Sequence, residues 1–180
     1  FTVANVTGGT VQGNSGDDSI TIGFAGRFGE AAGSMAAAAL TDGTVNGGQG
    51  ADEITIGDDV TVTGSAIRGN EGNDYIFISD EASISADSTI NGNAGDDDID
   101  AANAGAFSVL GGAGHDILRV SDGQTAVGGK GADTFSIEDN DGATITDYDN
   151  DDEADCFCDD VIQIDGNKIN YDTYEHKLTY

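Results

Sequence analysis

The ten residues "GNEGNDYIFI", Gly69–Ile78, combine two patterns that favour different structures. Gly, Asn and Asp stand at fixed offsets, and an apolar alternation that contains Ile76 and Ile78 follows them directly. Gly and Asn weaken strands, whereas alternating apolar residues indicate a strand with one buried face. The segment therefore predicts a turn that leads straight into a β-strand, and the composition of that turn needs its own explanation.

The first six residues of this segment belong to a hexamer that occurs six times in the chain. Position one is always Gly, position two is Gly or Asn, position four is always Gly and position six is always Asp. A chain of this composition would contain such a hexamer only about 0.1 times by chance. The hexamers are Gly13-Asn14-Ser15-Gly16-Asp17-Asp18, Gly47-Gly48-Gln49-Gly50-Ala51-Asp52, Gly69-Asn70-Glu71-Gly72-Asn73-Asp74, Gly92-Asn93-Ala94-Gly95-Asp96-Asp97, Gly111-Gly112-Ala113-Gly114-His115-Asp116 and Gly128-Gly129-Lys130-Gly131-Ala132-Asp133.

The fixed positions of the hexamer suit a site for a hard cation. Gly and Asn tolerate positive φ, and Gly allows two backbones to approach closely. A turn of this kind can direct several carbonyl oxygens at one point, and the Asp at its end adds a carboxylate. Ca²⁺ takes about six to eight such oxygens. One hexamer cannot supply that many but two stacked hexamers can, so the ions are predicted to lie between successive turns.

The predicted metal ligands come from every position of each hexamer except the fifth. Positions one to four contribute backbone carbonyls, and position six contributes a carboxylate. Six turns stacked in order leave five gaps, which predicts a row of about five calcium ions. The interior residues Asp74 and Asp97 should each serve two ions, and Asp18 and Asp133, as the ends of the row, one each.

Strand patterns flank every hexamer. An alternating apolar pair follows each Asp: Ile20/Ile22, Ile54/Ile56, Ile76/Ile78, Ile99/Ala101, Leu118/Val120 and Phe135/Ile137. One apolar residue precedes each turn: Val11, Val45, Ile67, Ile90, Val109 and Val127. The hexamers begin 34, 22, 23, 19 and 17 residues apart. These spacings predict an all-β chain of coils, each made of two or three short strands, wound into a parallel solenoid.

The longest spacing indicates an insert at roughly 23–44. Its stretch "EAAGSMAAAAL", Glu30 to Leu40, favours a short helix that Gly33 interrupts.

Charge and hydropathy exclude two classes of partner. The 180 residues include 34 acidic and 6 basic ones, for a formal net charge of -28. Nucleic-acid surfaces need clustered Lys and Arg, so no nucleic-acid partner is expected. No run of 18 apolar residues is present, so no membrane span is expected. The start, Phe1-Thr2-Val3, shows no signal-peptide pattern.

The six hexamers, each followed by an alternating aliphatic or aromatic residue, resemble the nonapeptide of RTX, or haemolysin-type, calcium-binding repeats. The resemblance covers about Gly13 to Ser136 and extends through "ATITDYDNDDEADCFCDDVIQIDG", which looks like the segment that closes such repeats. It implies a right-handed parallel β-roll or β-helix with calcium in its turns, export by type I secretion, and work outside the cell. It also implies two parts: a β-roll at 1–137 and an acidic capping segment at 138–180.

The chain departs from that family at its other edge, where no hexamer recurs. One main row of ions is therefore expected. The acidic residues of that edge could bind extra ions or form a solvated rim, and the rim is the preferred interpretation: Asp58, Asp59, Asp80, Glu81 and Asp122.

Three further features leave alternatives open. The acidic run Asp147, Asp149, Asp151 and Glu153 resembles the start of an EF-hand loop without its Gly, and is interpreted as a loose acidic cap that holds at most one calcium. Cys156 and Cys158 fit a strained disulfide, free thiols or a crosslink to another chain. His115 occupies a variable position and is expected to face solvent.

No grouping of Ser, His and acid predicts catalysis, so the chain is not expected to be an enzyme. Three functions remain. The first is a calcium-binding structural domain of an exported cell-surface protein of the S-layer type. The second is an accessory domain that helps a secreted protease or lipase to leave the cell and fold. The third is an adhesin module. Calcium is the expected ligand, and other copies of the chain or a cell-surface polysaccharide are the expected partners.

Overall fold

The computed structural model describes residues 1–23, 38–102, 104–137, 142–148, 160–164, 167–172 and 177–179. Within these ranges the protein is all-β, with long parallel sheets and no helix. It follows that no helix in this part of the chain is long and apolar enough to cross a membrane.

Three sheets, named here A, B and C, contain all of these strands. Sheet A comprises β1 (Thr2–Val3), β4 (Ser19–Ile22), β7 (Glu53–Ile56), β10 (Tyr75–Ile78), β13 (Asp98–Asp100), β15 (Ile117–Val120), β17 (Thr134–Ile137), β19 (Val161–Ile164), β20 (Asn167–Asp172) and β21 (Lys177–Thr179). Sheet B comprises β2 (Asn5–Thr7), β5 (Ala39–Thr41), β8 (Thr61–Thr63) and β11 (Ser83–Ile84). Sheet C comprises β3 (Thr10–Ser15), β6 (Thr44–Gln49), β9 (Ala66–Glu71), β12 (Thr89–Ala94), β14 (Ser108–Ala113), β16 (Thr125–Lys130) and β18 (Thr144–Ile145).

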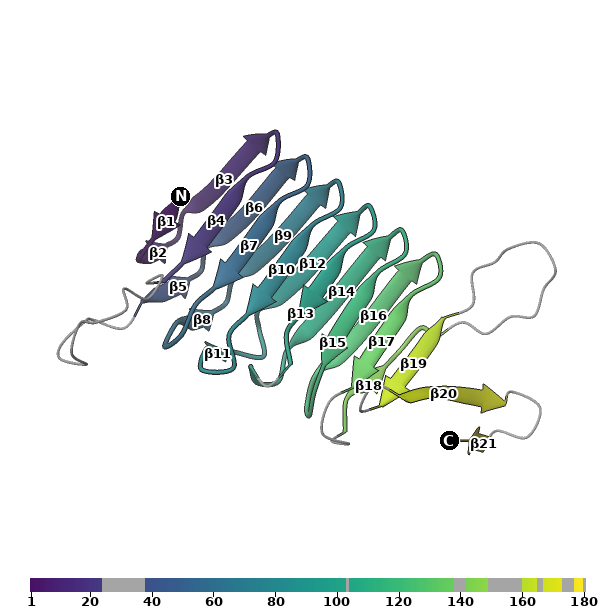
Figure 1. The fold of residues 1–180 in the computed structure, drawn as a ribbon. Helices are drawn as coiled ribbons and strands as arrows, with labels where there is room; N and C mark the ends of the chain where they lie inside the picture. The colour runs from purple at the N-terminus through teal and green to yellow at the C-terminus, as the bar shows by residue number, and fades with distance from the viewer. Residues whose placement is uncertain are drawn as a thin grey trace, which may run out of the picture.

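The chain passes through the sheets in a repeating order. β5, β6 and β7 belong to sheets B, C and A, and β8, β9 and β10 repeat that sequence one step further along each sheet. From β14 to β19, the strands alternate between sheets C and A alone. Pairing is parallel and in register from one repeat to the next, so equivalent residues of successive repeats lie side by side (Figure 1).

The core lies between the sheets and is made of the aliphatic residues that the sequence pattern marks as inward-facing. Ile20, Ile54 and Ile76 occupy one register of sheet A, and all three are fully buried. In sheet C the buried residue stands two positions before each hexamer, as Val45, Ile67, Ile90 and Val109 do. This spacing corrects the prediction for the last hexamer: Ala126 pairs with Val109 and is buried, whereas Val127 lies on the opposite face of β16. A shift of one residue along a strand reverses the face that a side chain occupies.

Part of the predicted insert is regular strand. Residues 24–37 lie outside the described ranges, and so does most of the predicted helix. Leu40, at the end of that helix, instead lies in β5 with its side chain fully buried between Val6 of β2 and Val62 of β8 in the register of sheet B. Thr44, at the end of the predicted insert, begins β6.

The parallel sheets continue beyond residue 137, where the predicted capping segment begins. β18 pairs with β16, and β19 pairs with β17, both in parallel. The direction reverses only at β20, which pairs antiparallel with β19. An antiparallel strand at this end covers hydrogen-bonding groups that another parallel strand would otherwise take.

Truncation of one buried isoleucine tests the inward row. Ile76→Ala should lower the free energy of unfolding by about 2–5 kcal/mol, because Ile76 is fully buried in sheet A. Ile117→Ala is the matched control, since Ile117 lies on the outer side of the same sheet with 36% of its surface exposed, and should change that free energy by about 0.5 kcal/mol or less. Denaturant unfolding with calcium present measures both, and equal losses would contradict the assigned faces.

Candidate metal centre

The six hexamers occupy equivalent places in the fold. The first three residues of each hexamer end a strand of sheet C, and the last three form the turn into sheet A. These turns follow one another along a single edge of the molecule, where the strands of sheet C turn over into sheet A (Figure 1). The structure thus brings the predicted ligand-bearing residues into columns, one column for each position of the hexamer.

The backbone explains the choice of residues at positions two and four. Position two has a positive φ in all six turns, from 81° at Asn93 to 130° at Gly48. This conformation suits Gly and Asn and strains most other residues. Position four also has a positive φ in every turn, and from the second turn onward a Cβ there would lie within 3.0 Å of the position-four carbonyl of the turn before. Position four is Gly in all six turns.

The Asp residues at position six form a buried, hydrogen-bonded column. Asp52, Asp74, Asp97, Asp116 and Asp133 are each 1–2% exposed. Each of them accepts, through Oδ1, a hydrogen bond from the backbone N–H of the Asp one turn earlier, at 2.8–2.9 Å. The side chain of one turn thereby fixes the backbone of its neighbour.

The second carboxylate oxygen of each Asp has no hydrogen-bond partner among the described residues. Oδ2 is buried without a hydrogen bond in all six: Asp18, Asp52, Asp74, Asp97, Asp116 and Asp133. A buried and unpaired carboxylate oxygen is costly, so six in one column call for a positive group. No ion pair joins any of the six to a Lys, Arg or His of the described residues.

Position-one glycines hold these oxygens beside a neighbouring carbonyl. A Cβ on any of the six would lie within 3.0 Å of Oδ2 of the Asp in the same hexamer. At Gly13, Gly47 and Gly111 the position-one carbonyl of the next turn would lie equally close to that Cβ. In these three turns a carboxylate oxygen and a carbonyl oxygen thus lie close to the place that a Cβ would occupy. A hard cation takes oxygen ligands of these two kinds.

Burial makes the column a poor place for charge without a cation. The pKa of Asp97 is raised to about 7, chiefly by burial and also by the charges of Asp116 and Asp74, against the lowering effect of the hydrogen bond from the Asp74 N–H. Burial likewise raises the pKa of Asp74 and of Asp116 to about 6. The pKa values of Asp52 and Asp133 are also raised, with burial again the largest cause. Without metal, protons would supply the missing positive charge.

The donor set fits calcium, provided that carbonyls supply most of the ligands. In the described part of the chain, no group of three or more His, Cys, Asp or Glu side chains could hold a metal ion by itself. A gap between two hexamers brings together two carboxylates of the column, and the backbones of both turns would provide the other oxygens. Carboxylates mixed with carbonyls suit Ca²⁺ better than Zn²⁺, which favours Cys and His.

The column has a seventh member that the sequence analysis missed. Asp160 is buried, pairs with Asp133 through the register of β17 and β19, and accepts the Asp133 N–H at 2.9 Å through Oδ1. The sequence pattern predicts that Asp133 is the end of the column. That prediction is wrong, because Asp160 follows it. Residues 149–159 lie outside the described ranges. The sequence signal was an Asp directly before an alternating strand, Val161–Ile164, without the glycines.

Asp147 also has a defined place. Its two carboxylate oxygens accept hydrogen bonds from the N–H groups of Gly128 and Gly129 at 2.9 and 2.8 Å. The carboxylate thereby caps the first two backbone N–H groups of the last hexamer. The other members of the predicted acidic cap, Asp149, Asp151 and Glu153, lie outside the described residues, as do Cys156 and Cys158.

Position five contributes to the stack, although its residue type varies. Asp17, Asn73, Asp96 and His115 each accept, through the side chain, the N–H of the position-five residue in the next turn. His115 is exposed, as expected, but its Nδ1 accepts the Ala132 N–H at 3.0 Å. Four of the six position-five side chains thus link neighbouring turns, a role that only the register reveals.

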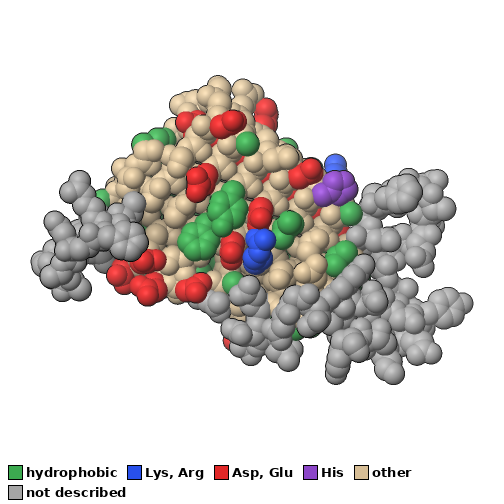
Figure 2. Space-filling view, in the orientation of Figure 1, with side chains coloured by type: hydrophobic (Ala, Val, Ile, Leu, Met, Phe, Trp, Pro, Cys, Tyr) green, Lys and Arg blue, Asp and Glu red, His purple; other side chains and the backbone are tan. Residues whose placement is uncertain are grey.

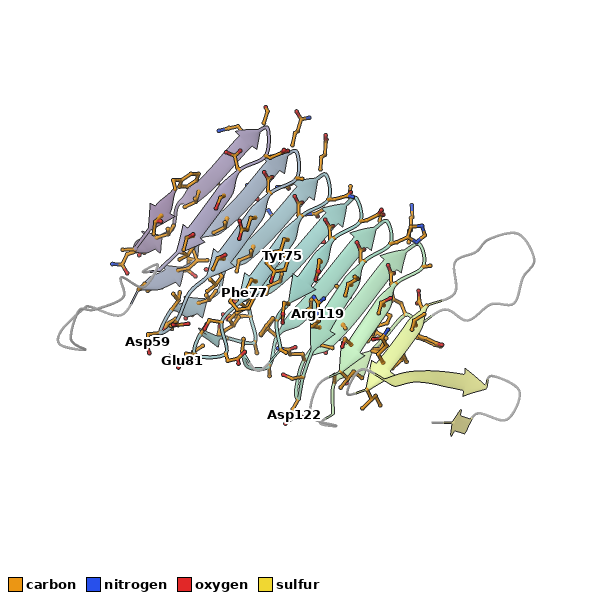
Figure 3. The ribbon with its side chains drawn as sticks, in the orientation of Figure 1. Asp59, Tyr75, Phe77, Glu81, Arg119 and Asp122 are labelled. Carbon is orange, nitrogen blue, oxygen red and sulfur yellow. The ribbon has the colours of Figure 1, made fainter. Side chains whose placement is uncertain are left out.

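The opposite edge has no comparable column. Asp58, Asp59, Asp80, Glu81 and Asp122 are all exposed. Figure 3 shows Asp59, Glu81 and Asp122 along the edge away from the hexamer turns. Asp58 accepts a hydrogen bond from the Ser79 hydroxyl. These exposures agree with a solvated rim.

Comparisons with protein-family models, with curated proteins and with solved structures gave no match.

Alanine at position four tests the close stacking of the turns. Gly16→Ala should cost about 1–2 kcal/mol of stability, because φ is positive there but nothing lies near the new Cβ. Gly72→Ala should cost about 1–3 kcal/mol more, because its Cβ would overlap the Gly50 carbonyl. Thermal unfolding of both variants in calcium gives the comparison, and similar melting temperatures would rule out this packing.

Asp97→Asn should change stability in opposite directions in chelator and in calcium. Asn can accept the Asp74 N–H through Oδ1 while it places an uncharged amide where Oδ2 lacks a partner. In chelator at pH 8 the variant should be more stable than the wild type by about 1–3 kcal/mol. In calcium it should be less stable, because one carboxylate ligand is lost.

The pH dependence of the wild type in chelator provides the companion measurement. Raised pKa values mean that the folded state binds more protons than the unfolded state, so stability falls as pH rises from about 4 through 7. Asp97→Asn should flatten this fall. A metal-free strand signal in circular dichroism that rises steadily with pH over that window would show that the column is not buried as described.

Proposed function

We propose that the chain is a calcium-binding structural domain of the RTX type, folded as a right-handed parallel β-roll with a row of about five ions along its hexamer edge. It would work outside the cell as part of an exported surface protein, and it would not be an enzyme. The parallel sheets, their in-register stacking and the repeated order of strands support this solenoid.

The column of buried carboxylate oxygens carries the proposal. Six oxygens without partners occur at one register, each beside the position-one glycine of its own turn. Stacked strands lie about 4.7–4.9 Å apart, well inside the Debye length of about 8 Å at physiological salt. Unscreened like charges at this spacing repel, and a divalent cation in each gap would remove the repulsion where it is strongest.

Calcium would act as the switch for folding. About five ions would add +10 and change the formal charge from -28 to -18. The glycine-rich turns also lose much entropy when they become ordered, and metal binding offsets part of that loss. Extracellular modules bind calcium with Kd of about 10⁻⁴–10⁻³ M, so a domain in that range would stay unfolded in calcium-poor cytoplasm and fold after export.

The surface-layer setting rests on composition. The chain is rich in Ala, Gly, Thr and Asp, poor in Lys, and lacks Pro and Trp. Such a domain would present its remaining negative charge to solvent.

Circular dichroism during a calcium titration tests the proposal, with magnesium as the control. The strand signal should be weak in chelator and should rise cooperatively near millimolar calcium, while magnesium has little effect because it favours a smaller octahedral shell with bound waters. A full strand signal in chelator that calcium leaves unchanged, in both signal and melting temperature, would refute a folding role for the metal.

A further inference from the structure

The outer face of sheet A carries an unusual pair of residues on β10. Two outward rows run across this sheet, and on β4 and β7 they hold only polar residues: Ser19, Thr21, Glu53 and Thr55. On β10 the same two rows hold Tyr75 and Phe77. Figure 3 shows both side chains on the face turned toward the viewer. The core gains little from aromatic rings on the outside of a sheet, so their presence needs another reason.

The two rings are arranged side by side on the strand. Their centroids are 6.5 Å apart and their planes meet at 18°. Tyr75 is 39% exposed, and Ile117, two strands away in the same row, is 36% exposed. Exposed aromatic and aliphatic surface gathered on one face is typical of a docking surface. Figure 2, in the same orientation, shows hydrophobic side chains in the middle of this face with acidic groups around them.

Carboxylates border the rings on both sides. Asp98 and Asp100 lie beside Tyr75 and Phe77 on β13, and Glu53 lies beside Tyr75 on β7. At the hexamer end of β10 the surface is hollowed by about 440 Å³ between Tyr75, Glu53, Asp96 and Asp98, among others. At the other end a hollow of about 400 Å³ lies between Phe77 and the carboxylates of Asp58, Asp80, Glu81 and Asp100. A shallow acidic path therefore runs along the aromatic pair.

One basic side chain of the protein, Arg119, already binds to carboxylates of this surface. Arg119 of β15 forms an ion pair with Asp98 through both of its terminal nitrogens, and its charge also interacts with Asp100 and Tyr75. Burial raises the pKa of Asp100 even though Arg119 acts in the opposite direction. A second cation near Asp100 would thus stabilise a carboxylate that water solvates only in part.

We propose that this aromatic–acidic patch, formed by Glu53, Tyr75, Phe77, Asp98 and Asp100, docks an extended peptide segment of a partner protein that carries Arg or Lys at alternate positions. Aromatic faces and carboxylates together recognise guanidinium and ammonium groups. Alternate residues of an extended chain repeat at about 6.7 Å, close to the 6.5 Å between the two rings. The acidic surroundings attract a cationic segment and give no comparable preference for an uncharged polysaccharide.

The test uses the calcium-loaded protein and a fluorescent peptide in which Arg alternates with Thr, at physiological salt. A peptide with Glu in place of Arg is the ligand control. Fluorescence anisotropy should show binding of the Arg peptide alone. Tyr75→Ser with Phe77→Thr should weaken this binding about tenfold, because two cation–π contacts are lost. Ser19 and Thr21 occupy the same rows on β4, so this variant should fold, and circular dichroism verifies it.

Two double variants with equal charge change separate the patch from general attraction. Glu53→Gln with Asp100→Asn removes two charges from the patch and leaves the Asp98–Arg119 pair in place. Asp59→Asn with Asp122→Asn removes two exposed charges from the far edge (Figure 3). The first pair should weaken binding severalfold and the second less than about twofold.

Three outcomes would overturn the proposal. One is the absence of binding by the folded wild type. Another is equal loss in the two charge variants together with no loss in the aromatic variant, which would indicate nonspecific attraction to an acidic protein. The last is binding of neutral oligosaccharides that depends on Tyr75 and Phe77 while the Arg peptide does not bind, which would assign the patch to a carbohydrate.

Discussion

The contact that organises this molecule is the one between the Asp carboxylate of one turn and the backbone N–H of the Asp before it. Each carboxylate uses Oδ1 to hold its neighbour and leaves Oδ2 buried with no partner. The first oxygen makes the turns stack closely, and the second makes that stack electrostatically unstable without a cation. The glycines follow from the same contact, because the carboxylate lies where a position-one Cβ would be and the preceding turn lies where a position-four Cβ would be.

Much of the fold could be predicted because each turn meets the same local demands. Positive φ restricts position two to Gly or Asn, and burial restricts the residues that follow Asp to an alternating apolar pattern. The features that were missed depend on register between repeats. Asp160 joins the column through its pairing with Asp133, but the sequence before it lacks the glycines that mark the six hexamers. Ala126 replaces Val127 in the core because spacing, and not hydrophobicity, decides which residue faces inward. Hydrogen-bond acceptors at position five are likewise visible only once the turns are stacked.

The candidate metal site and the outer face of sheet A answer to different constraints. Along the hexamer edge, every repeat must match the next, so the residue choices are narrow. On the outer rows of sheet A a side chain contacts solvent and its row neighbours, and residues as different as Thr55, Phe77 and Asp100 occupy one row. In such a domain the residues of the hexamer edge are restricted by stacking, whereas the residues on the outer face of sheet A can vary. The aromatic pair on β10 is informative because nothing in the stacking requires it.

The hydrogen bonds between turns all point the same way, so the two ends of the stack are chemically different. After Asp133, the donors that remain are matched by Asp147 and Asp160. Between two existing turns, a whole added repeat would offer its carboxylate to the turn before it and its N–H to the turn after it, and would leave the closing residues untouched. Gene duplication could thus lengthen the domain in single-repeat steps, with one closing segment serving stacks of different lengths.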